Sequence, residues 1–202
     1  MGLASLDIVA GGFPRGRITE IAGPVSSGRT TVLHRLLSTA TRRGEYCAVV
    51  DGGNAFDPRS AAESGTDLDA LVWVRCSGNL EHAVKVTDLL VHGGGFGVVA
   101  LDLCDIPARE LRKIPLSWWY RFRRAVEGTE TILLFLEREP LAKACASLIA
   151  GMNRQTAGFT GVRQFQWLAG GRFRITARKP IYPGPGAELE TEALDMSLRA
   201  DY

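Results

Sequence analysis

Short apolar runs alternate with amphipathic segments along most of this chain. The runs are residues 17–23, 46–51, 71–75, 96–102 and 131–137. Nearly continuous apolar runs of this length are typical of strands that are buried on both faces. Because helix-like segments lie between them, the pattern predicts β-α alternation. We therefore expect an α/β fold whose mainly parallel sheet is flanked by helices.

Two of the intervening segments carry clear helix signals. The first keeps its apolar residues at helical spacing, and Gly44 follows it as a C′ residue would. Those apolar residues are Val32, Leu33, Leu36, Leu37 and Ala40. In the second, Asn79 is placed to cap a helix that ends at the glycines of positions 93–95. Its predicted buried stripe is Leu80, Ala83, Val84 and Leu90.

The C-terminal part of the chain has a different pattern. Residues 162–168 and 172–178 alternate about a Gly-Gly pair, which predicts a C-terminal β-hairpin with these two segments as its strands. A stretch rich in proline and glycine follows, and then an acid-rich segment. We therefore expect one core domain over residues 1–180 and a flexible acidic tail over residues 181–202.

Composition narrows the class of protein only moderately. The chain has 202 residues, of which 46% are hydrophobic and 23% charged, as in an ordinary globular domain, and its net charge of +2 permits nucleic-acid contact without implying it. The four cysteines are widely spaced and predict buried, reduced thiols. We find no basic-then-apolar start typical of a signal peptide, so the sequence predicts a cytoplasmic protein.

The stretch GPVSSGRT, residues 23–30, matches the phosphate-loop pattern G-x-x-x-x-G-K-[ST] except that Arg29 replaces the lysine. In such a loop, backbone N–H groups and a helix N-terminus hold phosphates, Thr30 would bind Mg²⁺, and Asp102 would be a second Mg²⁺ ligand. The motif alone is also compatible with a plain strand-to-helix turn. An arginine is longer and forked, so it cannot place the same point charge. The candidate nucleotide-site residues are Gly23, Ser26, Ser27, Gly28, Arg29, Thr30, Thr31 and Asp102.

Several of these segments resemble RecA, over about residues 10–180. The likeness is carried by GGFPRGRITEIAGPVSSGRTT (11–31), DGGNAFDP (51–58) and GVVALD (97–102). By this resemblance Thr30 and Asp102 match the Mg²⁺-coordinating residues. Arg29 departs from the lysine, and Gly53 stands where RecA proteins have the glutamate that polarises the attacking water. The resemblance therefore implies a RecA-like core without an intact catalytic set, for which we expect no cofactor, with ATP or ADP and Mg²⁺ as the alternative.

The segments 68–103, 114–127 and 139–148 are similar to ImuA, a RecA-like component of bacterial damage-tolerance cassettes. That similarity implies a role in the SOS response and translesion synthesis. It also implies as partners an ImuB-like Y-family polymerase homologue, an error-prone replicative-type polymerase, and RecA. We expect no membrane partner.

Residues 115–128 are the most distinctive surface candidate. Their aromatic and basic side chains suit single-stranded DNA, and they suit a protein interface equally well. A third interpretation is an amphipathic helix with Trp118 in the core and solvated arginines. The candidate surface residues are Trp118, Trp119, Arg121, Arg123 and Arg124.

Three functional hypotheses follow from the sequence. The leading one is a non-catalytic accessory protein that acts through protein contacts. The others are a nucleotide-binding ATPase or switch of the RecA type, and a single-stranded DNA binder. For Asp51 and Asp57, we expect structural hydrogen bonds in the loop after the second strand.

Overall fold

A computed structural model of the chain describes residues 12–162, 165–179 and 189–197. The strands are β1 (Arg17–Ala22), β2 (Tyr46–Asp51), β3 (Leu71–Arg75), β4 (Phe96–Asp102), β5 (Ile132–Glu137), β6 (Leu148–Val162), β7 (Phe165–Lys179) and β8 (Leu189–Ser197). The helices are α2 (Arg29–Arg42), α3 (Pro58–Glu63), α4 (Leu80–Gly93), α5 (Ala108–Leu111) and α6 (Leu116–Val126), with 3-10 turns η1 (Leu68–Ala70) and η2 (Lys143–Cys145).

All described strands belong to one sheet with the order β3-β2-β4-β5-β1-β6-β7-β8. Pairing is parallel from β3 to β6 and antiparallel from β6 to β8. The α/β fold, the mainly parallel sheet and the C-terminal hairpin are thus confirmed. The five predicted apolar runs are the strands β1 to β5. Four of them are central parallel strands, which must be apolar on both faces, and β3 is the partly buried edge strand.

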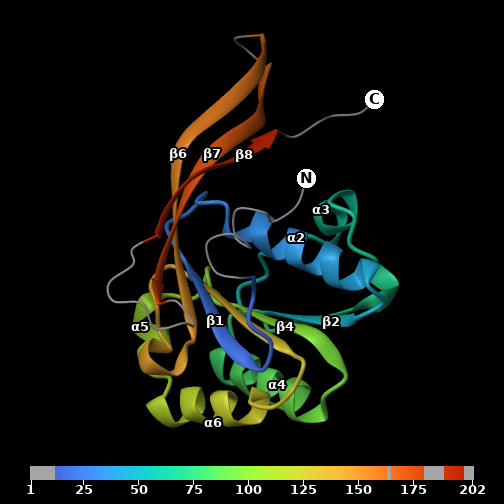
Figure 1. Cartoon of the computed structure of the whole chain (residues 1–202), viewed down its shortest axis with the longest axis vertical. Coiled ribbons are helices and arrows are strands. Elements are labelled where there is room, and N and C mark those ends of the chain that lie inside the picture. The colour runs from blue at the N-terminus through green and yellow to red at the C-terminus, as the bar shows by residue number, and fades with distance from the viewer. Residues whose placement is uncertain (1–11, 163–164, 180–188, 198–202) are drawn as a thin grey trace.

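Helices cover both faces of the parallel part of the sheet (Figure 1). One face packs against α2 and α3, through side chains such as Val49, Ala100 and Leu134. The other face packs against α4, α5 and α6, through Val50, Leu101 and Phe135. Consecutive residues of each strand therefore enter different cores, as the period of two requires. Among the described residues, no helix combines the length and the apolar character needed to cross a bilayer.

Both predicted helix signals are found. Gly44 follows the C-cap Arg43 of α2 with φ +77°, a left-handed conformation that glycine adopts without strain. Asn79 caps α4, and its side-chain oxygen accepts from the backbone N–H of His82 at 3.0 Å. In the predicted stripe of α4, Ala83 and Val84 are buried, while Leu80 and Leu90 are half-buried. These local signals were sufficient to place both helix ends.

The hairpin is built from different strands than predicted. Residues 165–168 and 172–178 belong to the same strand, β7, and the partner of β7 is β6. The Gly170–Gly171 pair is not the turn. It lies inside β7, opposite Gly158 and Ala157, where the register of β6 shifts. Glycines within a strand often mark such an irregularity, which is why the pair resembled a turn in the sequence. In Figure 1, β6 and β7 extend well beyond the layered part of the molecule.

Part of the predicted flexible tail is a strand. Residues 189–197 form β8, which pairs antiparallel with β7 from Leu189 opposite Ala177 to Ser197 opposite Gly170. The prediction of a tail is therefore corrected for these residues, whereas residues 181–188 and 198–202 lie outside the described part. The acidic residues of this segment alternate with apolar ones, and that alternation is a strand-like pattern.

Helix α6 is rotated relative to the expected orientation. Trp119 is only 2% exposed, and its ring contacts Phe135 of β5, with the two ring centroids 5.2 Å apart. Trp118, a candidate surface residue that the amphipathic-helix interpretation instead placed in the core, is half-buried. The placement of Trp119 on the candidate surface is thus wrong. Phe122 and Val126 are fully buried, so the buried stripe of α6 runs through Trp119 instead of Trp118.

Candidate functional site

The loop between β1 and α2 takes left-handed backbone conformations at two positions. Ser26 and Gly28 both have positive φ values, +60° and +91°. Gly23 fits only because it has no side chain, since a Cβ at this position would lie 2.3 Å from the main-chain oxygen of Met152 in β6. The pattern of glycines therefore has a steric cause in the fold.

The side chain of Arg29 is directed toward the sheet. It is 8% exposed, and its Nη1 donates to the main-chain oxygen of Glu137 at 2.5 Å. The same oxygen accepts from the backbone N–H of Gly23 at 3.1 Å. A single carbonyl at the end of β5 thus holds both the first residue of the loop and the arginine that follows it. The Arg29 guanidinium thus binds a main-chain oxygen of the protein, whereas the lysine of a phosphate loop would bind phosphate.

The remaining candidate side chains are divided between the surface and the interior. Ser26 and Thr30 are exposed, Gly28 and Thr31 are half-buried, and Ser27 is 1% exposed. The hydroxyl of Ser27 has no hydrogen-bond partner among the described residues. Asp102 lies at the end of β4 and is 5% exposed. The proposed Mg²⁺ ligands Thr30 and Asp102 therefore differ strongly in their access to solvent.

Asp102 lies at the carboxyl edge of the sheet, opposite Asp51 in the register of β2 and β4. One of its oxygens accepts from the backbone N–H of Cys104 at 2.9 Å. Burial raises the pKa of Asp102, and the charge of Asp51 adds to that rise, while the charge of Arg29 opposes it. The carboxyl of Asp102 is thus enclosed by protein, and one of its oxygens is already used by a backbone N–H group.

Asp51 and Asp57 have the structural roles that the sequence predicted. The two carboxylate oxygens of Asp51 accept from the backbone N–H groups of Ala55 and Phe56, each at 3.0 Å. Asp57 caps α3 and accepts from the backbone N–H of Ser60 at 3.2 Å. Both carboxylates therefore shape the loop that follows β2, and their hydrogen-bonding capacity is used locally.

Two buried carboxyl groups meet beneath the loop, and sequence reasoning missed them. Glu20 of β1 and Glu137 of β5 are both 0% exposed. One oxygen of Glu20 accepts from the backbone N–H groups of Leu141 and Ala142, at 2.7 and 2.5 Å. Burial and the neighbouring carboxyl of Glu20 raise the pKa of Glu137 well above its usual 4.5, because two buried carboxylates would repel each other. The available signal was the position of each acid within an apolar strand.

Gly53, which stands where RecA proteins have a glutamate, has no space for a side chain. A Cβ on Gly53 would lie 2.5 Å from the Cβ of Asp105, in the loop that follows β4. A glutamate at position 53 would therefore require this loop to move. The packing of Asp105 against Gly53 is therefore compatible with glycine and not with glutamate.

These residues do not fit MgATP as an intact phosphate loop does. The guanidinium at the lysine position is hydrogen-bonded to the main-chain oxygen of Glu137, and the Asp102 carboxyl is buried and accepts from the backbone N–H of Cys104. Within the described residues, no group of three or more histidine, cysteine or acidic side chains could hold a metal ion.

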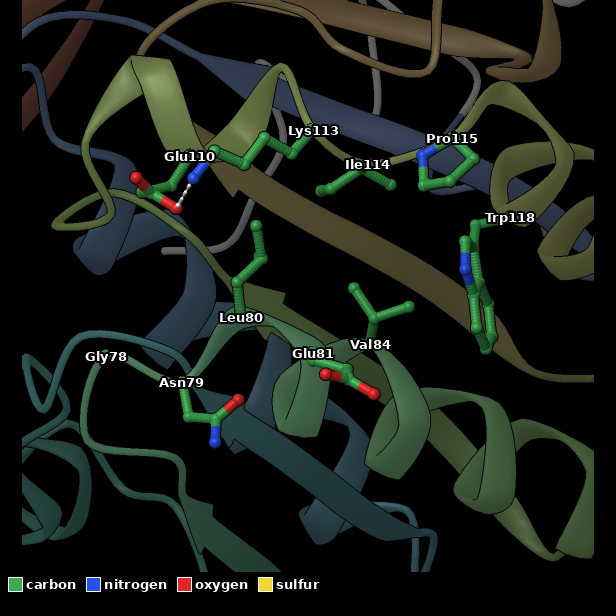
Figure 2. A pocket seen from close by; sticks show the side chains of 10 residues that line it. All are labelled: Gly78, Asn79, Leu80, Glu81, Val84, Glu110, Lys113, Ile114, Pro115 and Trp118. Atoms are coloured by element: carbon green, nitrogen blue, oxygen red, sulfur yellow. Dashed lines mark hydrogen bonds and ion pairs between the residues drawn. The ribbon is translucent and has the colours of Figure 1, made fainter.

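The five candidate surface residues are not one patch. Trp119 is in the core, and Arg121 is bound to Asp88 of α4 by two hydrogen bonds of 2.6 Å. Trp118 lines a groove of about 450 Å³ between α4 and the segment that joins α5 to α6 (Figure 2). Arg123 and Arg124 are exposed on α6. The surface that remains available thus consists of Trp118, Arg123 and Arg124, together with the groove that the sequence did not predict.

Comparison with known proteins gives one family. The sequence profile described as RecA N-terminal domain matches residues 1–111. Protein RecA of Cutibacterium acnes is 41% identical over 103 residues, which are 50% of this chain and 29% of that protein. Protein RecA of Teredinibacter turnerae is 42% identical over 103 residues, which are 50% of this chain and 30% of that protein. The matched segment thus covers less than a third of these relatives, and it contains the loop and the strands β1 to β4.

Proposed function

This chain belongs to the RecA N-terminal domain family, and on that premise we propose that it is a non-catalytic accessory protein of DNA damage tolerance that acts through protein contacts. Its partners in this proposal are an ImuB-like Y-family polymerase homologue, an error-prone replicative-type polymerase, and RecA. The resemblance of residues 68–103 and 114–127 to ImuA supports the choice of pathway. We expect it to work in the cytoplasm without a bound nucleotide or metal.

The internal bond of Arg29 carries the proposal that nucleotide is not turned over. Nucleotide hydrolysis in this family's fold requires a cation on the transferred phosphate. Here the guanidinium at that position is 8% exposed and 2.5 Å from the Glu137 main-chain oxygen. To reach a phosphate, Arg29 would have to leave a buried, charge-assisted hydrogen bond, which costs free energy.

The closure around Gly53 supports the same proposal independently. Hydrolysis also needs a side chain that orients the attacking water. A side chain at position 53 would meet the Cβ of Asp105 at 2.5 Å. Arg29, in place of the lysine, and Gly53, in place of the glutamate, are therefore both fixed by contacts within the protein. This is expected of a domain whose fold is retained without catalysis.

Titration calorimetry with MgATP and MgADP tests this part of the proposal, together with a phosphate-release assay. We expect no saturable heat and no phosphate release from the natural sequence. Arg29→Lys is the matched variant, because lysine restores the phosphate-loop pattern while the rest of the loop is unchanged. Saturable binding or release by the natural sequence would contradict the proposal and would favour the nucleotide-switch hypothesis.

A direct binding measurement tests the proposed contacts. The purified chain is mixed with each of the three proposed partners, and complexes are separated by size-exclusion chromatography. We expect a complex with at least one of them at low micromolar concentration, in the absence of DNA and nucleotide. Binding to single-stranded DNA alone, with a steep loss of affinity as salt is raised, would instead favour the third hypothesis.

A further inference from the structure

We propose that the outer ends of β6 and β7 form a docking arm, which enters an apolar cleft with an acidic rim on a partner protein. The arm consists of residues 159–162 of β6 and 165–168 of β7, which we call the outer ribbon. This inference rests on the proposed function, because a protein that acts through contacts needs a surface for them. It adds the element that makes the contact and the chemistry of the partner.

The outer ribbon has two strands only, and it begins where Phe159 lies opposite Leu168. Among the described residues, β1 pairs with β6 no farther out than Gly151, and β8 pairs with β7 no farther out than Gly170. Figure 1 shows that β6 and β7 here extend beyond the layered part of the molecule and its helices. Two strands without a third strand or a helix against them are only marginally stable in water. The outer ribbon therefore needs a further layer to cover it.

Both faces of the outer ribbon are rich in apolar residues. Five of its eight residues are bulky and apolar, and residues opposite each other in an antiparallel pair share a face while consecutive residues alternate. One face therefore holds Phe159 and Leu168. The other holds Val162, Phe165 and Trp167. Apolar residues on both faces are typical of strands that lie between two covering layers. A flat partner surface would leave one face uncovered, whereas a cleft covers both.

The same two strands have a different pattern close to the core. There Met152 lies opposite Ile175, and both are buried against the core that includes α2. The next pair, Asn153 opposite Arg174, is exposed. One apolar face and one polar face are what a ribbon needs when a single layer covers it. The change to apolar residues on both faces therefore coincides with the part of the ribbon that leaves the domain.

Charge determines the chemistry of the rim. The strands β6 and β7 contain no aspartate or glutamate, and their cationic residues are Arg154, Arg172, Arg174, Arg178 and Lys179. Asp195 of β8 lies opposite Arg172, whereas Arg154 is exposed on β6, five positions before the outer ribbon begins. Cations at the base of the arm attract carboxylates at the rim of the cleft that receives it. A second copy of the chain would bring like charges together, which disfavours it as the occupant.

The outer ribbon suits a protein better than nucleic acid. Phosphate binding requires several cations along the bound strand, and Arg163 is the only cation between residues 159 and 168. Val162 and Leu168 have no ring on which a base could stack. Bulky side chains that fill pockets of a partner instead carry most of the binding energy of protein interfaces. The composition of the outer ribbon therefore favours a protein cleft.

Biolayer interferometry with the full-length chain tests the inference. The ImuB-like homologue, the error-prone polymerase and RecA are immobilised in turn, and the natural sequence and its variants are titrated against each. Phe159→Asp and Trp167→Asp place a charge on the two faces separately, and each should weaken binding by roughly 10-fold or more. Arg154→Glu should weaken binding by roughly 3-fold or more, because it would repel an acidic rim. A labelled oligothymidylate of about 20 nucleotides is titrated in parallel.

Matched variants separate loss of the contact from loss of the fold. Phe159→Leu and Trp167→Phe keep each face apolar and should bind within about 3-fold of the natural sequence. Leu89→Asp, at a site on α4 that is 71% exposed, and Arg35→Glu, at an exposed site on α2, make similar charge changes elsewhere and should leave the affinity unchanged. Thermal unfolding followed by circular dichroism should be alike in all variants, because the outer ribbon lies beyond the layered part of the molecule (Figure 1).

Several outcomes would overturn the inference. These are an effect of only one of the two aspartate variants, stronger binding of Arg154→Glu, self-association that the aspartate variants abolish, and oligothymidylate binding that is lost in Trp167→Asp. If a partner binds the natural sequence and both aspartate variants equally, the proposed function stands and only the arm is rejected. If no partner binds, the proposed contacts are rejected and the arm with them. If the aspartate variants lose a partner while the natural sequence hydrolyses MgATP, the arm stands and the proposed function is rejected.

Discussion

Arg29 and Glu137 are 108 positions apart in the chain, yet the guanidinium of one donates to the main-chain oxygen of the other at 2.5 Å. This bond joins the start of α2 to the end of β5. The same carbonyl also accepts from Gly23, so the loop is fastened at both ends to one strand. The conformation of the loop is therefore maintained by the protein itself and requires no ligand.

Replacing Arg29 by alanine should destabilise the fold. A hydrogen bond to a charged group contributes about 1.5–3 kcal/mol, and Arg29→Ala removes one while leaving the carbonyl satisfied by Gly23. Urea unfolding at neutral pH measures the loss. The exposed Arg35, on the same helix, provides the control, and Arg35→Ala should change stability by less than about 0.5 kcal/mol. Equal effects of the two changes would show that the internal bond contributes nothing.

Glu137→Gln should flatten the dependence of stability on pH. Because the pKa of Glu137 in the folded state is raised well above 4.5, the folded protein binds this proton more tightly than the unfolded chain does. The resulting stability is complete below about pH 4.5 and is lost as pH rises toward the folded-state pKa. Glutamine stays neutral at every pH, so the variant avoids this loss. The raised pKa of Asp102 acts in the same direction and leaves a smaller slope in the variant.

Urea unfolding between about pH 5 and pH 9 tests this prediction. The free energy of unfolding of the natural sequence should fall with rising pH relative to that of Glu137→Gln. Glu130→Gln, at an exposed site, should follow the natural sequence. Parallel curves for the natural sequence and Glu137→Gln would contradict the raised pKa of Glu137.

The two adjacent tryptophans of α6 should differ strongly in their contribution to stability. Trp119→Ala removes a side chain that is 2% exposed and in contact with Phe122 and Phe135, and it should cost about 3–5 kcal/mol. Trp118→Ala removes a half-buried ring at the end of the groove and should cost clearly less. Thermal unfolding of both variants measures the difference. A larger loss for Trp118 would contradict the observed rotation of α6.

The cysteine thiols should be unreactive in the folded protein. Burial raises the pKa of Cys47 to about 12, and it also raises the pKa of Cys76 and Cys104. All four cysteines are buried and in the thiol form, so a thiol reagent such as DTNB near pH 8 should modify them slowly. Addition of denaturant should release four thiols at once. Rapid modification of a thiol under native conditions would identify a site that opens locally.

Features set by local sequence could be predicted, whereas features set by long-range packing could not. Contiguous apolar runs identify buried strands, and Asn79 and Gly44 mark helix ends through their own backbone requirements. The pairing of Glu20 with Glu137 depends on the parallel register of β1 and β5, which places Glu137 opposite Ala22 and Glu20 opposite Phe135. No local pattern records that register. In the sequence, each acid is only a single polar residue within an apolar run.

The rotation of α6 illustrates the same limit. Trp118 and Trp119 are adjacent, and both are large and apolar, so the hydrophobic pattern allows either to lead the buried stripe. The contact of Trp119 with Phe135 depends on how the helix lies on β5. The Gly170–Gly171 pair was misread for a related reason, because glycine serves both turns and strand irregularities. In each case the sequence allowed two local structures, and partners distant in the chain determined the outcome.

The position of β1 in the sheet has a consequence for how this chain acquires its structure. Both neighbours of β1 come from the second half of the sequence, β5 at Ile132–Glu137 and β6 at Leu148–Val162. During synthesis, β1 therefore leaves the ribosome long before either partner exists, and the loop after it cannot close until about 150 residues have been made. Contacts of such sequence separation slow folding. The segment that matches the RecA N-terminal domain profile, residues 1–111, thus contains β1 without the two strands that pair with it.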